Sequence, residues 1–175
     1  MGHGYILRCK ECHFEMTLNM GVGFLFPQVY QETMEAAKSG EYGAVVQEFL
    51  NSHPDGALNC ENVLLKCPEC NNLEMGLDLS MYIPGNDTKP REKGNWSVAF
   101  PFEGASYVAP WDLNDYELVR RYEHKCSKCG AVMKSINQEE MEKTPGAVLA
   151  GEKETEFLCP ECRKPLWHDG IVMWD

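Results

Sequence analysis

The sequence lacks any long hydrophobic run. Near the N-terminus the apolar run covers only Tyr5 to Leu7, which is too short for the core of a secretory signal. No stretch approaches the roughly 20 apolar residues that a membrane-spanning helix needs. We therefore expect a cytoplasmic protein that has no membrane partner.

Recognisable catalytic motifs are also missing. The chain has no His-Glu-x-x-His pattern, no glycine-rich phosphate loop after a strand and no Gly-x-Ser-x-Gly elbow. Its five histidines are scattered, and His53 and His168 stand close before Asp-Gly pairs, which are typical of turns. These absences favour a protein that is not an enzyme, although an enzyme with a pocket in the helical insert described below stays open as a hypothesis.

Positive charge is scarce. Lysine and arginine total 16 against 27 acidic residues, which gives a formal net charge of −11. Such a charge opposes counterion-driven binding to nucleic acid or to an anionic membrane. We expect a protein partner, with nucleic acid as the alternative because basic residues flank the cysteine pairs described next. These residues are Arg8, Lys10, Lys66, Lys125, Lys128, Arg163 and Lys164.

Cysteine, in contrast, is abundant and regularly spaced. Eight of the nine cysteines form four Cys-x-x-Cys pairs, in "RCKECH", "LKCPECNN", "KCSKCG" and "FLCPECRK". Two thiolates at this spacing converge on one ion across a tight turn, a knuckle, and two knuckles complete a tetrahedral site. A single pair would also suit a redox dithiol, but four copies that open no amphipathic helix favour metal. The predicted ligands are Cys9, Cys12, Cys67, Cys70, Cys126, Cys129, Cys159 and Cys162.

Two zinc ions per chain follow from this count. Four thiolates around each ion leave no open position for a substrate, so both sites are predicted to be structural. His13 and His124 flank knuckles and could serve as outer or alternative ligands, although a bystander role is favoured for each. The ninth cysteine, Cys60, is expected to be a small buried hydrophobic residue.

Four knuckles can be joined into two sites in three ways. The cost of closing a loop rises with its length, and neighbouring elements usually pack together. This favours sequential pairing, with the knuckles at Cys9 and Cys67 in one site and those at Cys126 and Cys159 in the other.

The residues around the knuckles alternate like β-hairpins. Apolar residues recur at every second position before and after the first knuckle, and again from Leu73 to Met81 after the second. "GAVMKSI" follows the third knuckle and "LWHDGIVMW" follows the fourth. Each half of the chain therefore resembles a zinc ribbon, in which one ion clamps two knuckle hairpins.

Two further resemblances rest on quoted residues. "CSKCG" and "CPEC" in the second half are spaced as in rubredoxin, which implies iron and electron transfer as the alternative to zinc. Arg163 departs from this pattern, because rubredoxin has glycine at that position. The four knuckles together with "GVGFLFPQVY" and "HPDG" resemble an uncharacterised family of bacterial double zinc-ribbon proteins, which implies no particular activity.

The sequence predicts a small α+β protein, mostly β, with two zinc-ribbon lobes and short helical inserts. The first lobe covers residues 1–83 and contains a helical insert at about 27–51. Pro27 suits a first helical turn, and helices are predicted at 27–38 and 41–51. Residues 84–95 are rich in Pro, Gly and charge and are predicted to be a linker. The second lobe covers 96–175, and "DLNDYELVRRYEH" within it predicts a short helix capped by Asp112 or Asn114.

An aromatic segment opens the second lobe. Exposed aromatic residues are common anchors in protein interfaces, so this segment is the candidate surface for a protein partner. The alternative is that the rings fill space between two small ribbons that lack other core. The candidate residues are Trp96, Phe100, Phe102, Tyr107 and Trp111.

Overall fold

The computed structural model describes residues 2–85, 107–143 and 153–174. The chain forms two compact units: unit 1 consists of Met1–Phe24, Glu61–Asp78 and Glu123–Asp175, and unit 2 of Leu25–Cys60 and Leu79–Tyr122. Both units are therefore built from segments that are discontinuous in the sequence. This division differs from the expected lobes 1–83 and 96–175, because the two ends of the chain pair within one sheet.

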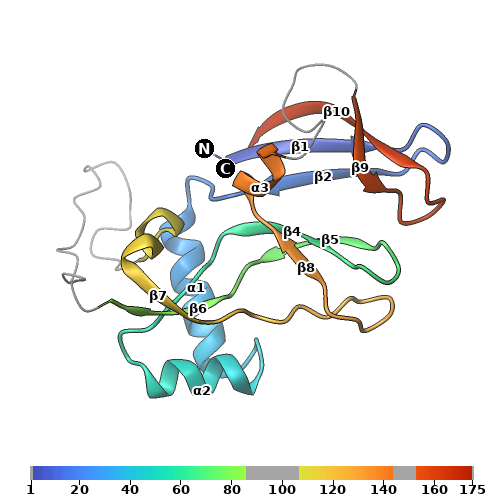
Figure 1. Ribbon diagram of the computed structural model, residues 1–175. Helices are drawn as coiled ribbons and strands as arrows, with labels where there is room; N and C mark the ends of the chain where they lie inside the picture. Colours follow the sequence, from blue (N-terminus) through green and yellow to red (C-terminus); the bar gives the residue numbers. More distant parts are fainter. Residues whose placement is uncertain (1, 86–106, 144–152, 175) are drawn as a thin grey trace. The chain divides into compact units, whose positions relative to one another are not determined.

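Sheet A of unit 1 joins those ends. Its strands are β1 (Gly2–Arg8), β2 (Glu15–Met20), β9 (Lys153–Leu158) and β10 (Pro165–Trp174), arranged antiparallel in the order β2-β1-β10-β9 (Figure 1). The central pair, β1 and β10, runs in register from Gly2↔Trp174 to Arg8↔Trp167, with one irregularity between Ile6 and Leu7. A knuckle lies in the connection of each outer pair.

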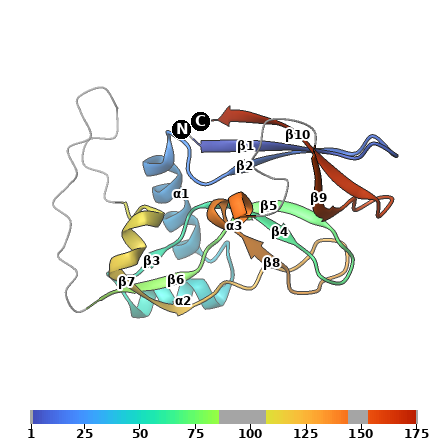
Figure 2. The ribbon, with the colours of Figure 1, turned by 45° about the horizontal axis from the view of Figure 1, so that its top comes forward.

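Sheet B of unit 1 comes from the middle of the chain. It contains β4 (Asn62–Lys66), β5 (Leu73–Leu77) and β8 (Lys134–Ile136) in the antiparallel order β5-β4-β8. Helix α3 (Gln138–Lys143) follows β8 directly (Figure 2). The β4–β8 pairing matters for the metal sites, because β4 leads into the second knuckle and β8 follows the third.

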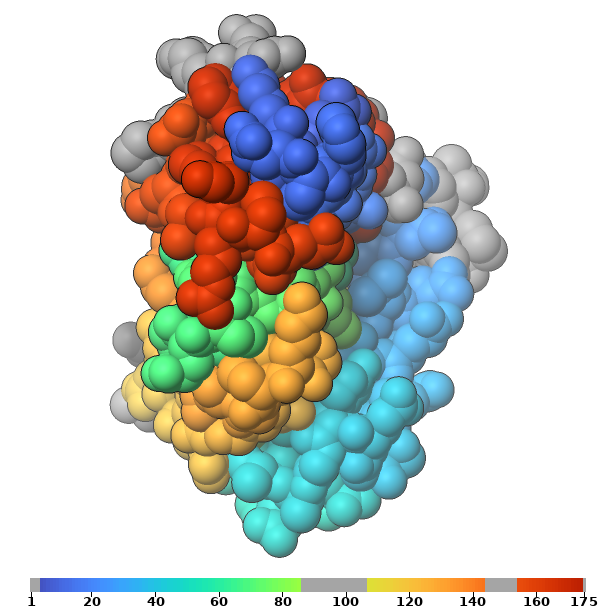
Figure 3. Space-filling model, turned by 90° about the vertical axis from the view of Figure 1, so that its right-hand side faces the viewer, coloured from blue at the N-terminus to red at the C-terminus, as the bar shows by residue number. Residues whose placement is uncertain are grey.

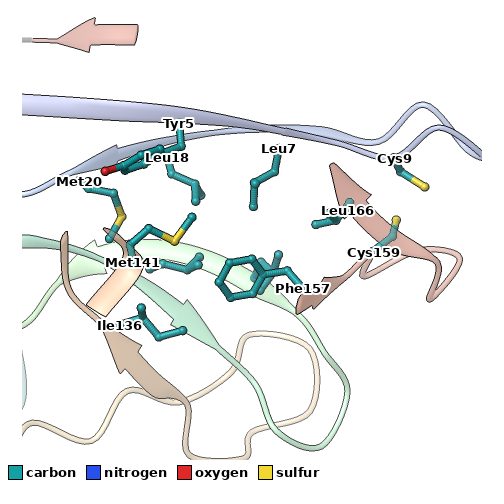
Figure 4. Packing of buried hydrophobic residues seen from close by; sticks show 12 residues of the cluster. Tyr5, Leu7, Cys9, Leu18, Met20, Ile136, Met141, Phe157, Cys159 and Leu166 are labelled. Atoms are coloured by element: carbon teal, nitrogen blue, oxygen red, sulfur yellow. The ribbon is translucent and has the colours of Figure 1, made fainter. Parts of the chain in front are cut away.

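The core of unit 1 contains side chains from both of its sheets and from α3 (Figure 4). Alternation along β1 and β2 sends every second side chain inward, as the sequence predicts for half-buried strands. Two cysteine ligands, Cys9 and Cys159, are members of this core. The cluster is Tyr5, Leu7, Cys9, Leu18, Met20, Leu64, Leu73, Ile136, Met141, Phe157, Cys159 and Leu166.

Unit 2 combines two helices with a small sheet. Helix α1 (Phe26–Ser39) packs against α2 (Ala44–Ser52), and the antiparallel strands β3 (Ala57–Leu58), β6 (Met81–Pro84) and β7 (Tyr116–Arg120) follow the order β3-β6-β7. A 3-10 helix, η1 (Pro110–Asp115), precedes β7. Helix α1 is followed by Gly40, whose φ of 91° suits glycine.

The mostly β, α+β fold class is confirmed, and so are the hairpins around the first, second and fourth knuckles. The helix predicted from "DLNDYELVRRYEH" is wrong after Asp115. Tyr116 to Arg120 instead form β7, because pairing with β6 satisfies their backbone groups and the segment is rich in strand-forming side chains. The predicted linker lies outside the described residues from position 86 on. Among the described residues, no helix is long and apolar enough to cross a membrane.

Candidate metal centres

All four knuckles share one backbone pattern. In each, the N–H of the first cysteine donates to the carbonyl five residues later, and the N–H four residues later donates back to the first cysteine's carbonyl. The donor–acceptor distances lie between 2.8 and 3.2 Å. The four pairs of bonds are Cys9→Phe14 with His13→Cys9, Cys67→Asn72 with Asn71→Cys67, Cys126→Ala131 with Gly130→Cys126, and Cys159→Lys164 with Arg163→Cys159.

The residue after each second cysteine adopts a positive φ. The values are 62° for His13, 59° for Asn71, 74° for Gly130 and 62° for Arg163. Only Gly130 takes this conformation without a steric cost, since a side chain disfavours it elsewhere. The knuckle turn therefore outweighs the preference of His13, Asn71 and Arg163 for a negative φ. In particular, Arg163 does not prevent the fourth knuckle from forming the same turn as the others.

The knuckles pair in a nested order. Site 1 consists of Cys9, Cys12, Cys159 and Cys162, and site 2 of Cys67, Cys70, Cys126 and Cys129. In Figure 3, the blue and red segments of site 1 lie side by side, as do the green and orange segments of site 2. The first knuckle thus meets the fourth, and the second meets the third.

The predicted sequential pairing is therefore wrong, and so is the rubredoxin-like grouping of the second half. Cys126 and Cys129 belong to a different site from Cys159 and Cys162. The reason is strand pairing: β1 lies beside β10, and β4 lies beside β8. These strand pairs bring each knuckle to its partner, whereas the prediction relied on loop length and on packing between elements that are neighbours in the sequence.

The sulfur positions suit a tetrahedral ion. The Sγ atoms of each site lie within 4.8 Å of one another, and the Sγ–Sγ distance is 3.4 Å both for Cys9–Cys162 and for Cys67–Cys129. A disulfide would need about 2.05 Å. Four sulfurs at about 2.3 Å from one ion stand about 3.8 Å apart. The observed Sγ–Sγ distances are close to this value, so each group of four sulfurs is a four-cysteine metal site.

Site 1 is continuous with the core of unit 1. Cys9 and Cys159 are fully buried, and Cys12 and Cys162 pack against the same cluster. Figure 4 shows the sulfurs of Cys9 and Cys159 at the edge of the cluster, facing each other. The four sulfurs of site 1 therefore lie directly beside the apolar cluster of unit 1.

Site 2 has a smaller apolar surrounding but a polar network. Its cysteines Cys67, Cys70 and Cys126 pack with Val63, Leu65, Ala131 and Met133. Glu74 Oε1 accepts bonds from Asn72 Nδ2 at 2.6 Å and from the Ser127 N–H and hydroxyl at 3.0 and 2.7 Å. Asn72 Nδ2 also lies 3.8 Å from the sulfur of Cys126. Such outer partners orient metal ligands, and no short-range pattern in the sequence points to Glu74.

The thiol pKa values of site 2 diverge. Burial raises the pKa of Cys126, but the N–H of Cys129 and the thiol of Cys70 donate to its sulfur and bring the pKa down to about 6. At Cys129 the N–H of Ala131 lowers the pKa, yet the thiols of Cys67 and Cys70 raise it to about 12.

Site 1 shows the same contrast. Burial raises the pKa of Cys9, but the N–H groups of Cys12 and Glu11 outweigh it, and the pKa falls to about 7. The Phe14 N–H lowers the pKa of Cys12, while burial and the Cys159 thiol raise it to about 12. In both sites the sulfurs share protons, which a divalent ion displaces on binding.

Among the side chains that the structure describes, His13, His53, His124 and His168 lie outside both four-sulfur groups. His124 Nε2 donates to the Asp78 carbonyl at 3.1 Å, and His13 is exposed. His53 Nδ1 bonds Phe49 O at 3.0 Å at the end of α2. The turn predicted at His168 is wrong, because β10 continues through it and His168 is fully buried against Tyr5. Cys60 is buried, as predicted.

The candidate partner residues differ in their surroundings. Tyr107 lies against Phe26 of α1, with 6.1 Å between ring centroids, so its ring contributes to the packing of unit 2. Trp111 in η1 is 57% exposed. Trp96, Phe100 and Phe102 lie outside the described residues.

No protein-family model, curated protein or solved structure matches this chain.

The nested pairing predicts how metal is lost in double variants. Cys9→Ser with Cys162→Ser removes two ligands of site 1, so the protein should keep one ion. Cys126→Ser with Cys159→Ser removes one ligand from each site, so both ions should be lost or weakly held. Native mass spectrometry would count the ions, with Cys60→Ser as the control that keeps both. Sequential pairing requires the opposite result for the two double variants.

Proposed function

We propose that the protein binds two structural zinc ions in zinc-ribbon-like sites and acts as a protein-interaction or adaptor module. The observation that supports this most is the completeness of both donor sets, with four cysteine sulfurs within 4.8 Å of one another. An ion held by four protein ligands has no open position for substrate. Its role is then to hold the knuckles together.

Zinc is preferred to iron for two reasons. The rubredoxin-like spacing in the second half of the chain was the main argument for iron, and those four cysteines are divided between two sites. Zinc also accepts tetrahedral thiolate ligation without a redox role. When bound, each ion forms four metal–sulfur bonds that cross-link two knuckles. The metal site is stable only while its thiolates stay reduced, as in the cytoplasm.

The charge distribution favours a protein partner over nucleic acid. Two ions with eight thiolates change the formal charge from −11 to about −15. The knuckle tips carry exposed Glu11, Glu69 and Glu161. Parts of the basic rim are already neutralised or covered within the protein, since Arg8 pairs with Glu15 and Asp169, Lys125 lies 3.8 Å from Glu123, and Lys10 lies over Trp167.

Metal analysis tests the zinc assignment. Protein expressed without added zinc should contain two zinc ions per chain, because both complete thiolate sets select this ion. Inductively coupled plasma mass spectrometry gives the identity and the count. A red protein with a thiolate-to-iron absorption band that bleaches on reduction would replace zinc with iron.

A mobility-shift titration tests the exclusion of nucleic acid. With mixed DNA and RNA at physiological salt, we expect no binding tighter than about micromolar, because the net charge repels phosphates. Sub-micromolar binding that disappears in a Lys125→Gln, Lys128→Gln variant would favour the nucleic-acid-binding zinc ribbon instead.

Co-purification tests the partner surface. An exposed tryptophan loses a large apolar contact when truncated, so Trp111→Ala should reduce capture of a specific protein from native cells by about tenfold or more. Met173→Ala is a matched control, because Met173 is also 57% exposed but lies on β10 in unit 1. Equal capture by both variants and by the unaltered protein would argue against Trp111 as an anchor.

A further inference from the structure

Cys129 is the single exposed residue among the eight ligand cysteines. Of the eight ligand cysteines, four are buried and three are half-buried, whereas Cys129 is exposed. Oxidation and alkylation of a thiolate depend on access to its sulfur as well as on its charge. Site 2 is therefore more accessible than site 1 to oxidants and alkylating reagents in solution.

The backbone around Cys129 is also the least supported of the four knuckles. The other three knuckles connect strands of full hairpins, β1 with β2, β4 with β5 and β9 with β10. The third is flanked by one isolated bridge between Lys125 and Val132. Ser127 to Gly130 are all exposed, and the Cα of Gly130 faces open space. Few contacts oppose a displacement of this tip.

The rest of site 2 is held more firmly. Cys67 and Cys126 are buried, and Asn72 and Glu74 fix the start of the third knuckle through Ser127 and the sulfur of Cys126. Cys129 is absent from the apolar cluster that contains its three partner sulfurs. Cys129 is therefore the most accessible cysteine of site 2, and the sulfur of Cys67 lies 3.4 Å from the Cys129 sulfur.

We propose that site 2 is a peroxide-sensitive metal site in which Cys129 is oxidised first and is resolved by Cys67. This inference rests on the proposed function, since it assigns a response to the same structural zinc. Site 1 is the resistant member of the pair, because its four sulfurs are buried or packed against the core of unit 1.

The chemistry needs one hydrogen peroxide. The thiolate of Cys129 attacks one peroxide oxygen, the O–O bond breaks, and a sulfenic acid forms while hydroxide leaves. The thiolate of Cys67 then attacks the Cys129 sulfur, the S–O bond breaks, and a second hydroxide leaves as the disulfide forms. Two thiolates lose two electrons in total, and the peroxide takes both. Each hydroxide takes up a proton from solvent.

The product no longer binds metal well. A disulfide between Cys67 and Cys129 removes two of four thiolates, and the remaining pair, Cys70 and Cys126, is insufficient for a closed tetrahedral site. A cysteine ligates zinc as the thiolate and not as part of a disulfide, so the ion is released. A reductant that restores both thiolates reverses the change.

Peroxide titration of the protein loaded with two zinc ions is the test. A chromogenic zinc chelator follows release, and peptide mapping under non-reducing conditions identifies the oxidised cysteines. One of the two ions should leave at least about tenfold faster than the other, since exposure differs between the sites. The first disulfide should join Cys67 and Cys129 while the cysteines of site 1 stay reduced.

Two histidine variants provide matched arms. Cys129→His replaces the sulfur ligand at this position with a nitrogen ligand, so a metal ligand remains but the oxidisable sulfur is gone. The fast release of one ion should then be lost. Cys12→His makes the same change at the second cysteine of a site 1 knuckle, and the fast release should persist. Limited alkylation of the unaltered zinc-loaded protein with N-ethylmaleimide needs no variant, and it should modify Cys129 first.

Other results would overturn the proposal. Simultaneous loss of both ions, first oxidation within site 1, or fast release that persists in Cys129→His would each contradict it, as would alkylation that reaches another ligand cysteine first. The metal count before peroxide addition tests the proposed function separately. A protein that carries iron would contradict zinc, while the order in which its cysteines are modified would still decide the role of Cys129.

Discussion

The antiparallel pairing of β1 with β10 is the constraint on which the metal sites depend. It places the first and last strands of the chain side by side, and its register sets Arg8 opposite Trp167. Cys9 follows Arg8 directly, and two residues separate Cys162 from the start of β10 at Pro165. The ladder therefore delivers the first and fourth knuckles to one place. The second and third knuckles are left to each other, and the β4–β8 pairing aligns them.

Magnitudes explain why nesting prevails over the shorter loops of sequential pairing. Closing the chain from Cys12 to Cys159 instead of Cys12 to Cys67 involves a loop roughly 2.7 times longer, which costs only about 0.9 kcal/mol more. Full burial of one large aliphatic or aromatic side chain contributes about 1.5–3 kcal/mol. Sheet A with its partners buries Leu7, Leu18, Phe157 and Leu166 completely. Packing therefore outweighs loop length several times over.

Local patterns predicted the parts of this protein better than their arrangement. The Cys-x-x-Cys spacing identified all eight cysteines of the four-sulfur groups, and alternation identified three hairpins, because both signals lie within a few residues. Partner choice between knuckles depends on strand pairs that are distant in the sequence, as between Leu7 and His168. The same applies to His168, whose Asp-Gly neighbours suggested a turn until the pairing with β1 kept the strand continuous. Glu74 was missed because one of its two partners, Ser127, belongs to a different knuckle that is distant in the sequence.

Site 2 also closes the base of a long insertion. The chain leaves unit 1 after Asp78 and returns at Glu123. Close to these points, His124 donates to the Asp78 carbonyl, Ser135 bonds the Asp78 carboxylate at 3.3 Å, and Ser127 bonds Glu74. Four sulfurs around one ion would add a cross-link a few residues further along each segment. The ends of the insertion are thus held within unit 1 itself, so unit 2 need not supply that closure. The second four-cysteine group and the hydrogen bonds beside it, rather than the insertion, therefore maintain this junction.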